Sequence, residues 1–380
     1  MKPLPISTFN AQRERILALL NEIVGLESPT TDKAAVDRLG RRLKQEAEAL
    51  GASVSVQARA TAGDNLVCRW NPTPAEGSGG LLILAHMDTV HDLGALAKWP
   101  EPSSAERLRG PGVLDMKAGI VLALEAVRAL RAAGRMPRRP LTLLLNSDEE
   151  TGSAGSRELI EAEARRAEMV FTLEPAMPDG SLKTWRKGVG EILLRTRGVA
   201  SHAGGEHELG RNAIEELAHH ILAAQRLTDY ESGTTVNVGI VSGGTRSNVV
   251  PDQAEAQIDF RVLDKREVER LRAWADGLRP VIDGARVEAR VELNRPPMPQ
   301  DERMLATFEK ARAIGLELGL ALKASGTGGG SDANFVAPLG VAVLDGLGPQ
   351  GDGAHSEREY IQIDSLFERA ALLAALIENW

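Results

Sequence analysis

The chain has 380 residues, more than one ordinary hydrophobic core accommodates, so we expect two domains. Its composition, 43% hydrophobic and 26% charged, is that of a folded globular enzyme. A net charge of −8 without any long basic run argues against a nucleic-acid-binding protein, and no apolar stretch has the length of a membrane span.

The cysteine count and the N-terminus bear on the compartment. Cys68 is the only cysteine, so no internal disulfide forms, which is typical of a reducing compartment. In residues 1–26 the apolar residues recur at helical spacing and are interrupted by charges, unlike the apolar core of a signal peptide. We therefore expect a cytoplasmic protein. Periplasmic export by way of a leader already removed is the alternative.

Strands and helices alternate between about residues 65 and 175. Apolar runs predict strands at 65–70, 81–86, 141–145 and 169–175, and helical periodicity predicts helices at 116–134 and 153–167. Strands of a parallel sheet are buried on both faces and are therefore continuously apolar. This alternation predicts a largely parallel sheet covered by helices on both faces.

The order of elements changes after residue 186. The predicted elements are strand 191–198, helix 212–227, strands 234–241 and 254–263, helix 266–278 and strand 285–293. This β-α-β-β-α-β order is that of a ferredoxin-like domain. The α/β pattern then resumes and ends in a C-terminal helix. We predict an α/β catalytic domain built from residues 1–186 and 297–380, with residues 187–296 inserted as a ferredoxin-like α+β dimerisation or lid domain.

Side chains that bind metals follow several of the predicted strands. Sites in α/β sheets gather at the carboxyl ends of the strands, so these side chains should lie close together. They are His86 and Asp88, Glu149 and Glu150, Glu174, His355 after a glycine-rich loop, and Asp115 before a predicted helix.

The chemistry of this set favours a metal centre. Three adjacent acids, residues 148–150, follow a buried strand, and such crowding costs energy unless positive charge lies nearby. Imidazoles and carboxylates form a nitrogen and oxygen ligand set suited to Zn²⁺, and also to Co²⁺ or Mn²⁺. A pair of divalent cations would offset the acids.

Each residue also has a purely structural interpretation. Asp115 is a suitable N-cap for the helix that follows it. Residues 148–150 would interact favourably with the N-terminus of a helix beginning near Ser153. Glu174 alone would be an ordinary solvated loop residue, and a lone histidine such as His355 is usually not a ligand. The metal-site hypothesis rests on their convergence at one edge of the sheet.

Six motifs occur in order along nearly the whole chain. They are "HMDTV" at 86–90, "GPGVLDMKAG" at 110–119, "DEETGS" at 148–153, "EP" at 174–175, "SHAG" at 201–204 and "GAHSE" at 353–357. Together they resemble the M20 metallopeptidases, and within that family the glutamate carboxypeptidases of the carboxypeptidase G type. The form "GPG" before "VLDMKAG" favours this branch over the deacetylases and desuccinylases, which more often have "GRG".

The resemblance implies a centre with two Zn²⁺ per subunit, for which Co²⁺ or Mn²⁺ would be substitutes. His86 and Glu174 would hold one ion, and Glu150 and His355 the other. Asp115 would bridge the two ions.

The resemblance also implies roles for the residues beside the ligands. Asp88 would orient His86 by a hydrogen bond, as metal-bound imidazoles usually require. Glu149 would act as the general base. The peptide bond after Asp115 is expected to be cis.

Four further residues come from the predicted inserted domain and from a later loop. In relatives, a histidine at the position of His202 reaches the partner subunit's active site, and residues matching Asn248 and Arg261 bind the substrate carboxylate. Arg261 alternates with apolar neighbours, so a surface salt bridge is the alternative for it. The stretch 325–334, which contains Gly329, lacks the lysine of a P-loop and is predicted to cradle a carboxylate with its amides.

Three other histidines, His207, His219 and His220, are expected to be solvated on a loop or a polar helix face. The chain as a whole is expected to be a homodimeric zinc metallopeptidase. It would release a C-terminal amino acid, glutamate or a similar residue, from small peptides or N-acyl amino acids. No nucleic-acid or membrane partner is expected.

Two alternative functions stay open. One is an N-acyl amino acid deacylase with another side-chain preference, and the other is a catalytically silent, zinc-dependent binding protein. Glu149 argues against silence, because a binding protein has no need of a base beside its metals. A nicotinamide-dependent oxidoreductase is less favoured, because no G-x-G-x-x-G motif follows a strand.

Overall fold

The computed structural model describes residues 2–71 and 79–380, and the chain divides into two compact units. The first unit comprises Met1–Trp185, Gln300–Gly326 and Ser331–Trp380, and the second comprises Arg186–Pro299 and Thr327–Gly330. The stretch Thr327–Gly330 groups with the second unit, where Arg186 Nη1 donates to the carbonyls of Gly329 and Gly330 at 3.2 and 2.9 Å.

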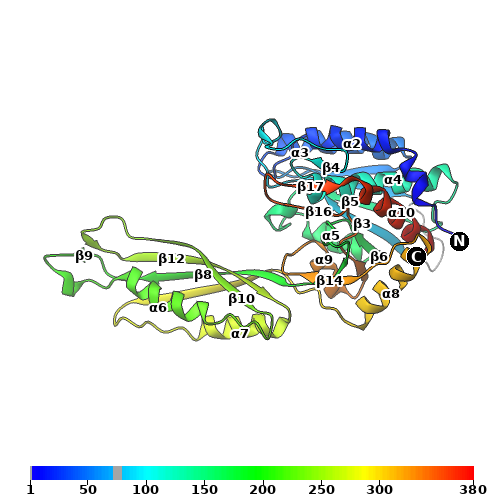
Figure 1. Ribbon diagram of the computed structural model, residues 1–380. Helices are drawn as coiled ribbons and strands as arrows, with labels where there is room; N and C mark the ends of the chain where they lie inside the picture. The colour runs from blue at the N-terminus through cyan, green and yellow to red at the C-terminus, as the bar shows by residue number, and fades with distance from the viewer. Residues whose placement is uncertain (1, 72–78) are drawn as a thin grey trace. The chain divides into compact units, whose positions relative to one another are not determined.

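A six-stranded mixed sheet organises the first unit (Figure 1). In spatial order its strands are β1 (Ser53–Gln57), β2 (Asn65–Trp70), β5 (Leu141–Asn146), β3 (Gly80–His86), β6 (Ala167–Thr172) and β15 (Ala342–Leu344). The strands β5, β3, β6 and β15 are parallel, whereas β1 and β2 add an antiparallel edge. The predicted, mostly parallel sheet is confirmed.

Helices cover both faces of this sheet. Leu81 and Ile83 of β3 belong to the core that contains α4 and α10, and Leu82 and Leu84, which point to the other face, are equally buried. On that other face α5 packs against β3 and β6. The helices are α1 (Ile6–Asn10), α2 (Arg13–Gly25), α3 (Lys33–Ala49), α4 (Ala118–Ala132), α5 (Arg157–Ala164), α8 (Glu302–Glu317), α9 (Ala333–Val336) and α10 (Ile363–Asn379). Among the described residues, no helix has the length and apolar character that a membrane crossing requires.

Two small sheets are formed mainly by residues of the first unit. One joins β16 (Gly351–Asp352), β17 (Tyr360–Gln362) and β4 (Arg107–Arg109), and the other joins β14 (Ala324–Thr327) to β7 (Leu182–Arg186). The strand β4 leads toward Asp115, and the hairpin of β16 and β17 contains His355. The three-stranded sheet therefore connects two segments that are far apart in the sequence.

The second unit has the predicted ferredoxin-like fold. Its antiparallel sheet has the order β10 (Thr235–Gly243), β12 (Gln253–Val262), β8 (Gly188–Arg197) and β13 (Arg286–Arg295). The helices α6 (Ala213–Gln225) and α7 (Lys265–Asp276) pack on one face, which receives every second residue of β12. A short pair, β9 (Ser201–His202) with β11 (Val249–Val250), lies outside this sheet.

The prediction of a solvated His220 is wrong. Its ring is buried on α6, and Nε2 lies 2.7 Å from Oε1 of Glu216, one helical turn earlier. The carboxylate of Glu216 also accepts from the backbone N–H groups of Val281 and Ile282. A buried, fully hydrogen-bonded pair of this kind joins α6 to the loop before β13.

The buried Cys68 of β2 provides a probe of folding. Its side chain is 0% exposed, and burial raises the pKa of the thiol to about 12. Because the thiolate is the reactive form, native protein at pH 8 should not react with an aromatic disulfide reagent. After unfolding in guanidinium, one thiol per chain should react at once. Rapid stoichiometric reaction without denaturant would contradict this burial.

Candidate metal centre

Three neighbouring parallel strands end together at one edge of the first unit's sheet. In the register of β3, His86 lies beside Asn146 of β5, and Leu84 lies beside Thr172 of β6. Residues that follow these strands therefore emerge next to one another. The side chains brought to this edge are His86, Glu149, Glu150 and Glu174.

Asp115 lies in an irregular turn before α4 rather than at its N-cap. The helix begins at Ala118, and its cap residue Lys117 makes no side-chain cap hydrogen bond. Asp115 has φ −115° and ψ 92°, and its peptide bond to Met116 is cis, as the resemblance implied. Gly112 has φ +69°, where a Cβ atom would lie 2.3 Å from Cγ2 of Thr89, so only glycine fits this turn.

The carboxylate of Asp115 lies between two imidazoles. Its Oδ1 is 3.1 Å from Nε2 of His86, and its Oδ2 is 3.4 Å from Nε2 of His355. His86 Nε2 is also 3.9 Å from Oε1 of Glu174, and His355 Nε2 is 3.2 Å from Oε2 of Glu150. Asp115 thus links one imidazole and glutamate pair to the other.

Asp88 forms hydrogen bonds both to His86 and to the backbone of Glu149 and Glu150. The backbone carbonyl of Asp88 lies 2.9 Å from Nδ1 of His86, so Nδ1 carries a proton and donates it there, leaving Nε2 directed at the carboxylates. The carboxylate of Asp88 is 3.5 Å from the same nitrogen, and it accepts the N–H groups of Glu149 and Glu150 at 3.2 Å each. Thr30 Oγ1 donates to it at 2.8 Å. Asp88 therefore orients His86 chiefly through its carbonyl.

The interpretation of the acidic run as a helix cap holds only for Asp148. Its carboxylate accepts from Ser156 Oγ at 2.5 Å and from the Gly155 N–H at 2.8 Å, just before α5 begins at Arg157. Glu149 and Glu150 instead turn toward the histidines: Glu149 lies in one possible ligand group with His86, and Glu150 in another.

The electrostatics of the cluster reflect its excess of acids. Hydrogen bonding to Asp115 and Glu150 raises the pKa of His355 to about 11. Burial works against the charged form of His86, but hydrogen bonds to Asp115 and Asp88 raise its pKa well above the ordinary value. Burial raises the pKa of Glu150. Five carboxylates surround two imidazoles, so the centre has negative charge in excess.

The residues at this edge fit a divalent cation. The possible ligand atoms of His86, Glu149 and Glu174 lie within 4.8 Å of one another, and so do those of His86, Asp115 and Glu150. Oε1 of Glu150 is buried without a hydrogen-bond partner among the described residues. A buried carboxylate oxygen normally has a partner, and a metal ion would supply one.

The predicted residues of the second unit fall into two groups. His202 is exposed on β9 and is paired with Val249 of β11, so Asn248, also exposed, lies beside it. Arg261 lies at the other end of β12, opposite Val189 of β8. From Gln253 to Arg261 this strand makes eight steps of roughly 3.3 Å, about 26 Å in all. The structure does not bring Arg261 together with the other two within one chain.

Arg261 and Gly329 already have partners. The guanidinium of Arg261 forms a two-armed ion pair with Asp259, with Nε 2.9 Å from Oδ1 and Nη2 2.9 Å from Oδ2. The surface salt bridge considered for Arg261 is therefore present. The N–H of Gly329 donates to Oγ1 of Thr327 at 3.2 Å, and its carbonyl accepts from Arg186.

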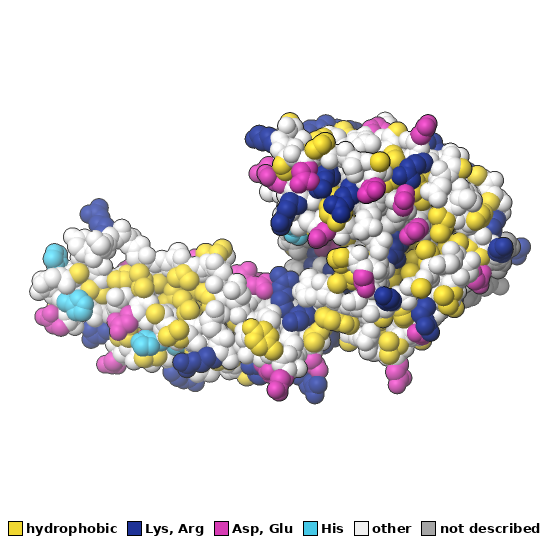
Figure 2. Space-filling view, viewed as in Figure 1, with side chains coloured by type: hydrophobic (Ala, Val, Ile, Leu, Met, Phe, Trp, Pro, Cys, Tyr) yellow, Lys and Arg dark blue, Asp and Glu magenta, His cyan; other side chains and the backbone are white. Residues whose placement is uncertain are grey.

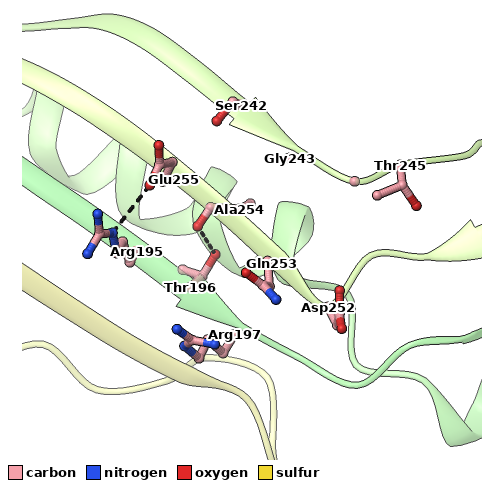
Figure 3. Close-up of a pocket in the computed structure, with 11 residues that line it drawn as sticks. Arg195, Thr196, Arg197, Ser242, Gly243, Thr245, Asp252, Gln253, Ala254 and Glu255 are labelled. Atoms are coloured by element: carbon pink, nitrogen blue, oxygen red, sulfur yellow. Dashed lines mark hydrogen bonds and ion pairs between the residues drawn. The ribbon is translucent and has the colours of Figure 1, made fainter.

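A cavity of about 570 Å³ lies elsewhere in the second unit, along β8, β10 and β12 (Figure 3). Arg195 and Glu255 pair across its wall at 3.2 Å, and Thr196 Oγ1 donates to the Ala254 carbonyl at 3.3 Å. None of the predicted site residues lines it. Its charged lining includes no imidazole, so it lacks the ligand set found at the sheet edge of the first unit.

Two residues near the centre escaped the sequence analysis. Thr30 donates to Asp88, and Glu359 accepts from the backbone N–H of Asp115. Thr30 lies in an N-terminal loop with no motif around it. Glu359 closely follows His355, and this proximity in the sequence is the one signal that could have connected it to the site.

Comparisons with known proteins agree with this arrangement. The sequence profile of the family described as peptidase family M20/M25/M40 matches residues 82–379. The chain is 32% identical to carboxypeptidase G2 of a Pseudomonas species, over 96% of this chain and 89% of that protein. It is 28% identical to succinyl-diaminopimelate desuccinylase of Dechloromonas aromatica, over 96% and 98%. The crystal structure of aminopeptidase PepT from Bacillus cereus superposes with a TM-score of 0.76 at 25% identity, covering 96% of this chain and 98% of the other. The chain belongs to peptidase family M20/M25/M40.

Proposed function

We propose that the chain is a dinuclear zinc carboxypeptidase or amidohydrolase that releases a C-terminal amino acid from small peptides or N-acyl amino acids. The observation that carries the proposal is the position of Asp115, whose two oxygens lie 3.1 and 3.4 Å from the Nε2 atoms of His86 and His355. A carboxylate that faces two separate ligand pairs is the arrangement a bridging ligand requires. His86 and Glu174 would hold one ion, and Glu150 and His355 the other.

The chain's own residues account for the proton transfers of amide hydrolysis. Two bound Zn²⁺ ions, replaceable by Co²⁺ or Mn²⁺, would supply positive charge that polarises the amide carbonyl and acidifies water. Glu149 accepts a proton from the water whose oxygen attacks the carbonyl carbon. When the C–N bond breaks, Glu149 passes this proton to the leaving amine. The carboxylate of Asp88 accepts hydrogen bonds from the backbone N–H groups of Glu149 and Glu150 and thereby fixes the backbone from which both glutamate side chains extend.

An acidic leaving amino acid, glutamate or a similar residue, is the substrate class that we favour. Arg261, Lys187 and the buried Arg295 lie at the same end of the second unit's sheet, where β8 begins and β13 ends. Burial, and then the charge of Arg261, lower the pKa of Lys187, as expected where cations are crowded. Such a concentration of positive charge suits carboxylates. The similarity to carboxypeptidase G2 supports the same substrate class.

A second candidate is a deacylase of N-acyl amino acids with another side-chain preference. The 28% identity to succinyl-diaminopimelate desuccinylase supports it. Both candidate enzymes cleave an amide bond of a substrate that carries a carboxylate. The proposed roles of Asn248, Arg261 and the loop at Gly329 in binding that carboxylate are therefore the same for both.

We place His202 in the reaction as a hydrogen-bond donor to the carbonyl oxygen. The N–H groups of Gly204 and Gly205 donate to its Nδ1 at 3.1 and 3.0 Å. An N–H group can only donate, so Nδ1 accepts and Nε2 carries the proton of the neutral ring. The imidazole is therefore prepared to donate through Nε2 to charge that develops on oxygen.

A homodimer formed through the second unit would bring His202 to a partner's substrate. His202 and Asn248 lie beyond the Gln253 end of β12 and Arg261 at its other end, so the length of this strand, about 26 Å, separates them within one chain. Hydrophobic side chains gather on the visible face of the second unit (Figure 2). Exposed apolar residues of α6 and of the edge strand β10 are Ile214, Leu222, Ile240 and Val241. A second copy would cover both the apolar surface and the unpaired edge.

The substrate is tested by a release assay. Metal-loaded protein is incubated with a panel of N-acyl amino acids and dipeptides, and the released amine is identified by mass spectrometry. Fastest release of glutamate from substrates that end in glutamate supports the first candidate. Preferential release of another amino acid supports the deacylase, and no release from any substrate supports a silent binding protein.

Metal content is expected to approach two equivalents of zinc per chain after dialysis against trace zinc. The reason is that the ligand set around Asp115 is too large for one tetrahedral ion. Elemental analysis of the dialysed protein measures this ratio. Asp115→Ala should retain at most one equivalent. A wild-type protein that is fully active with one equivalent would contradict the bridging role.

A further inference from the structure

We propose that Glu359 is a positioning residue for Asp115. Its carboxylate holds the backbone of residues 112–115 in the conformation that presents the Asp115 side chain to both imidazoles. The inference rests on the proposed metal centre and adds a residue that neither the motifs nor the ligand groups contain.

The carboxylate of Glu359 is fully buried and makes four hydrogen bonds. Oε1 accepts from the N–H groups of Leu114 at 2.8 Å and Asp115 at 3.0 Å. Oε2 accepts from the N–H of Gly112 at 3.0 Å and lies 2.8 Å from Nε2 of His91. Four partners match the roughly four acceptor positions of an ionised carboxylate.

The turn that carries Asp115 depends on these bonds because it has no regular structure of its own. The N–H groups of Val113 and Lys117 bond to carbonyls within the turn, those of Gly110 and Gly112. The three remaining N–H groups in 112–115 have Glu359 as their acceptor. A buried N–H group without an acceptor is unfavourable, so the turn would rearrange if the carboxylate were lost.

The position of Glu359 in the chain connects this turn to the second imidazole. Glu359 immediately precedes β17, which pairs with β16 on one side and with β4 on the other. The hairpin between β16 and β17 carries His355. One short segment therefore holds His355 directly and Asp115 through the carboxylate of Glu359, which fixes the spacing between the two.

His91 supports the carboxylate from the opposite side. Its ring meets Trp99 edge to face at 5.3 Å between centroids, and its Nε2 lies against Oε2 of Glu359. A packed ring of this kind restricts the rotamer of the glutamate. Glu359 is thus held by an imidazole as well as by the backbone N–H groups of the turn.

The test is Glu359→Gln, which keeps the shape and removes two of the four acceptor positions. Whichever way the amide turns, its NH₂ group faces at least one backbone N–H. We expect zinc affinity, measured by competition with a chromophoric chelator, to fall about 10–100-fold. Amide hydrogen exchange of peptides covering 110–117 should become faster, whereas exchange elsewhere should change little.

Glu125→Gln is the matched control. Glu125 is also buried in the first unit, where it pairs with Arg15 through two contacts of 2.6 Å, and it lies outside the 112–115 turn. This control should lower the melting temperature without changing zinc affinity or exchange at 110–117. If Glu359→Gln does not fold, Glu359→Asp serves in its place, because its shorter side chain keeps the charge but does not reach all three N–H groups.

The outcomes separate this inference from the proposed function. Wild-type protein that binds zinc, together with a folded Glu359 variant that binds it equally and exchanges equally at 110–117, overturns the inference alone. Wild-type protein that binds no zinc overturns the proposed function and the inference with it. Weakened zinc binding with locally faster exchange in the Glu359 variant, and neither change in Glu125→Gln, supports the inference.

Discussion

Glu149→Gln is expected to fold and bind metal like the wild type while its turnover number falls about 10²–10⁴-fold. The amide has the size of the carboxylate but accepts no proton, so water attack and protonation of the leaving amine both lose their carrier. The measurements are kcat with the best substrate of the release assay, zinc content and the melting temperature.

The Glu150→Gln variant distinguishes the proposed general base, Glu149, from the proposed metal ligand, Glu150. Oε2 of Glu150 lies 3.2 Å from His355, and its Oε1 is buried without a described partner, so its loss should lower metal content as well as turnover. The exposed Glu158→Gln on α5 is the neutral control. Equal zinc content in the Glu149 and Glu150 variants, together with an active Glu149→Gln, would show that the base has been wrongly assigned.

Mixing two inactive variants should restore activity. His202→Ala loses a donor to the carbonyl oxygen, expected to cost about 10²–10³-fold, and Glu149→Gln loses the base. In a mixed dimer, the His202→Ala subunit keeps its own Glu149 and receives His202 from the other chain. That site is whole and its counterpart lacks both groups, so each mixed dimer should have half the activity of a normal dimer.

Subunit exchange must be verified independently, for example by mass spectrometry of differently tagged chains. In the control, two preparations of His202→Ala that carry different tags are mixed. This mixture should stay inactive. If His202 acts within its own chain, every site in the mixture lacks one group. A mixture that exchanges but stays inactive would therefore rule out the arrangement across subunits.

The parts of the fold that the sequence predicted are those with long periodic segments. The strands β3, β5 and β6 each contain an apolar run, and the alternation along β8 and β12 marks one buried face. The direction of β2 relative to its neighbours could not be predicted, because an apolar run has the same pattern in both directions. Its antiparallel pairing with β5 became visible only in the structure.

The unpredicted parts near the site are short and depend on distant contacts. Strands of two or three residues, such as β16 and β4, have no measurable periodicity, yet they connect His355 to Asp115. The helical pattern of α4 continues back to Met116, but Asp115 and Met116 have non-helical backbone angles. Glu359 was missed because a glutamate beside a strand is common, and its three backbone partners lie more than two hundred residues earlier.

The division of the first unit into separate stretches of sequence has a consequence for synthesis on the ribosome. The second unit is nearly continuous, from Arg186 to Pro299, so it is able to fold as soon as that stretch emerges. The first unit cannot complete its fold until β15 pairs with β6 and α10 packs into the core, and both elements lie near the C-terminus. A nascent chain would therefore carry a largely folded second unit attached to an unfinished sheet, and His86 and Glu150 would meet His355 only after the C-terminal segment leaves the exit tunnel.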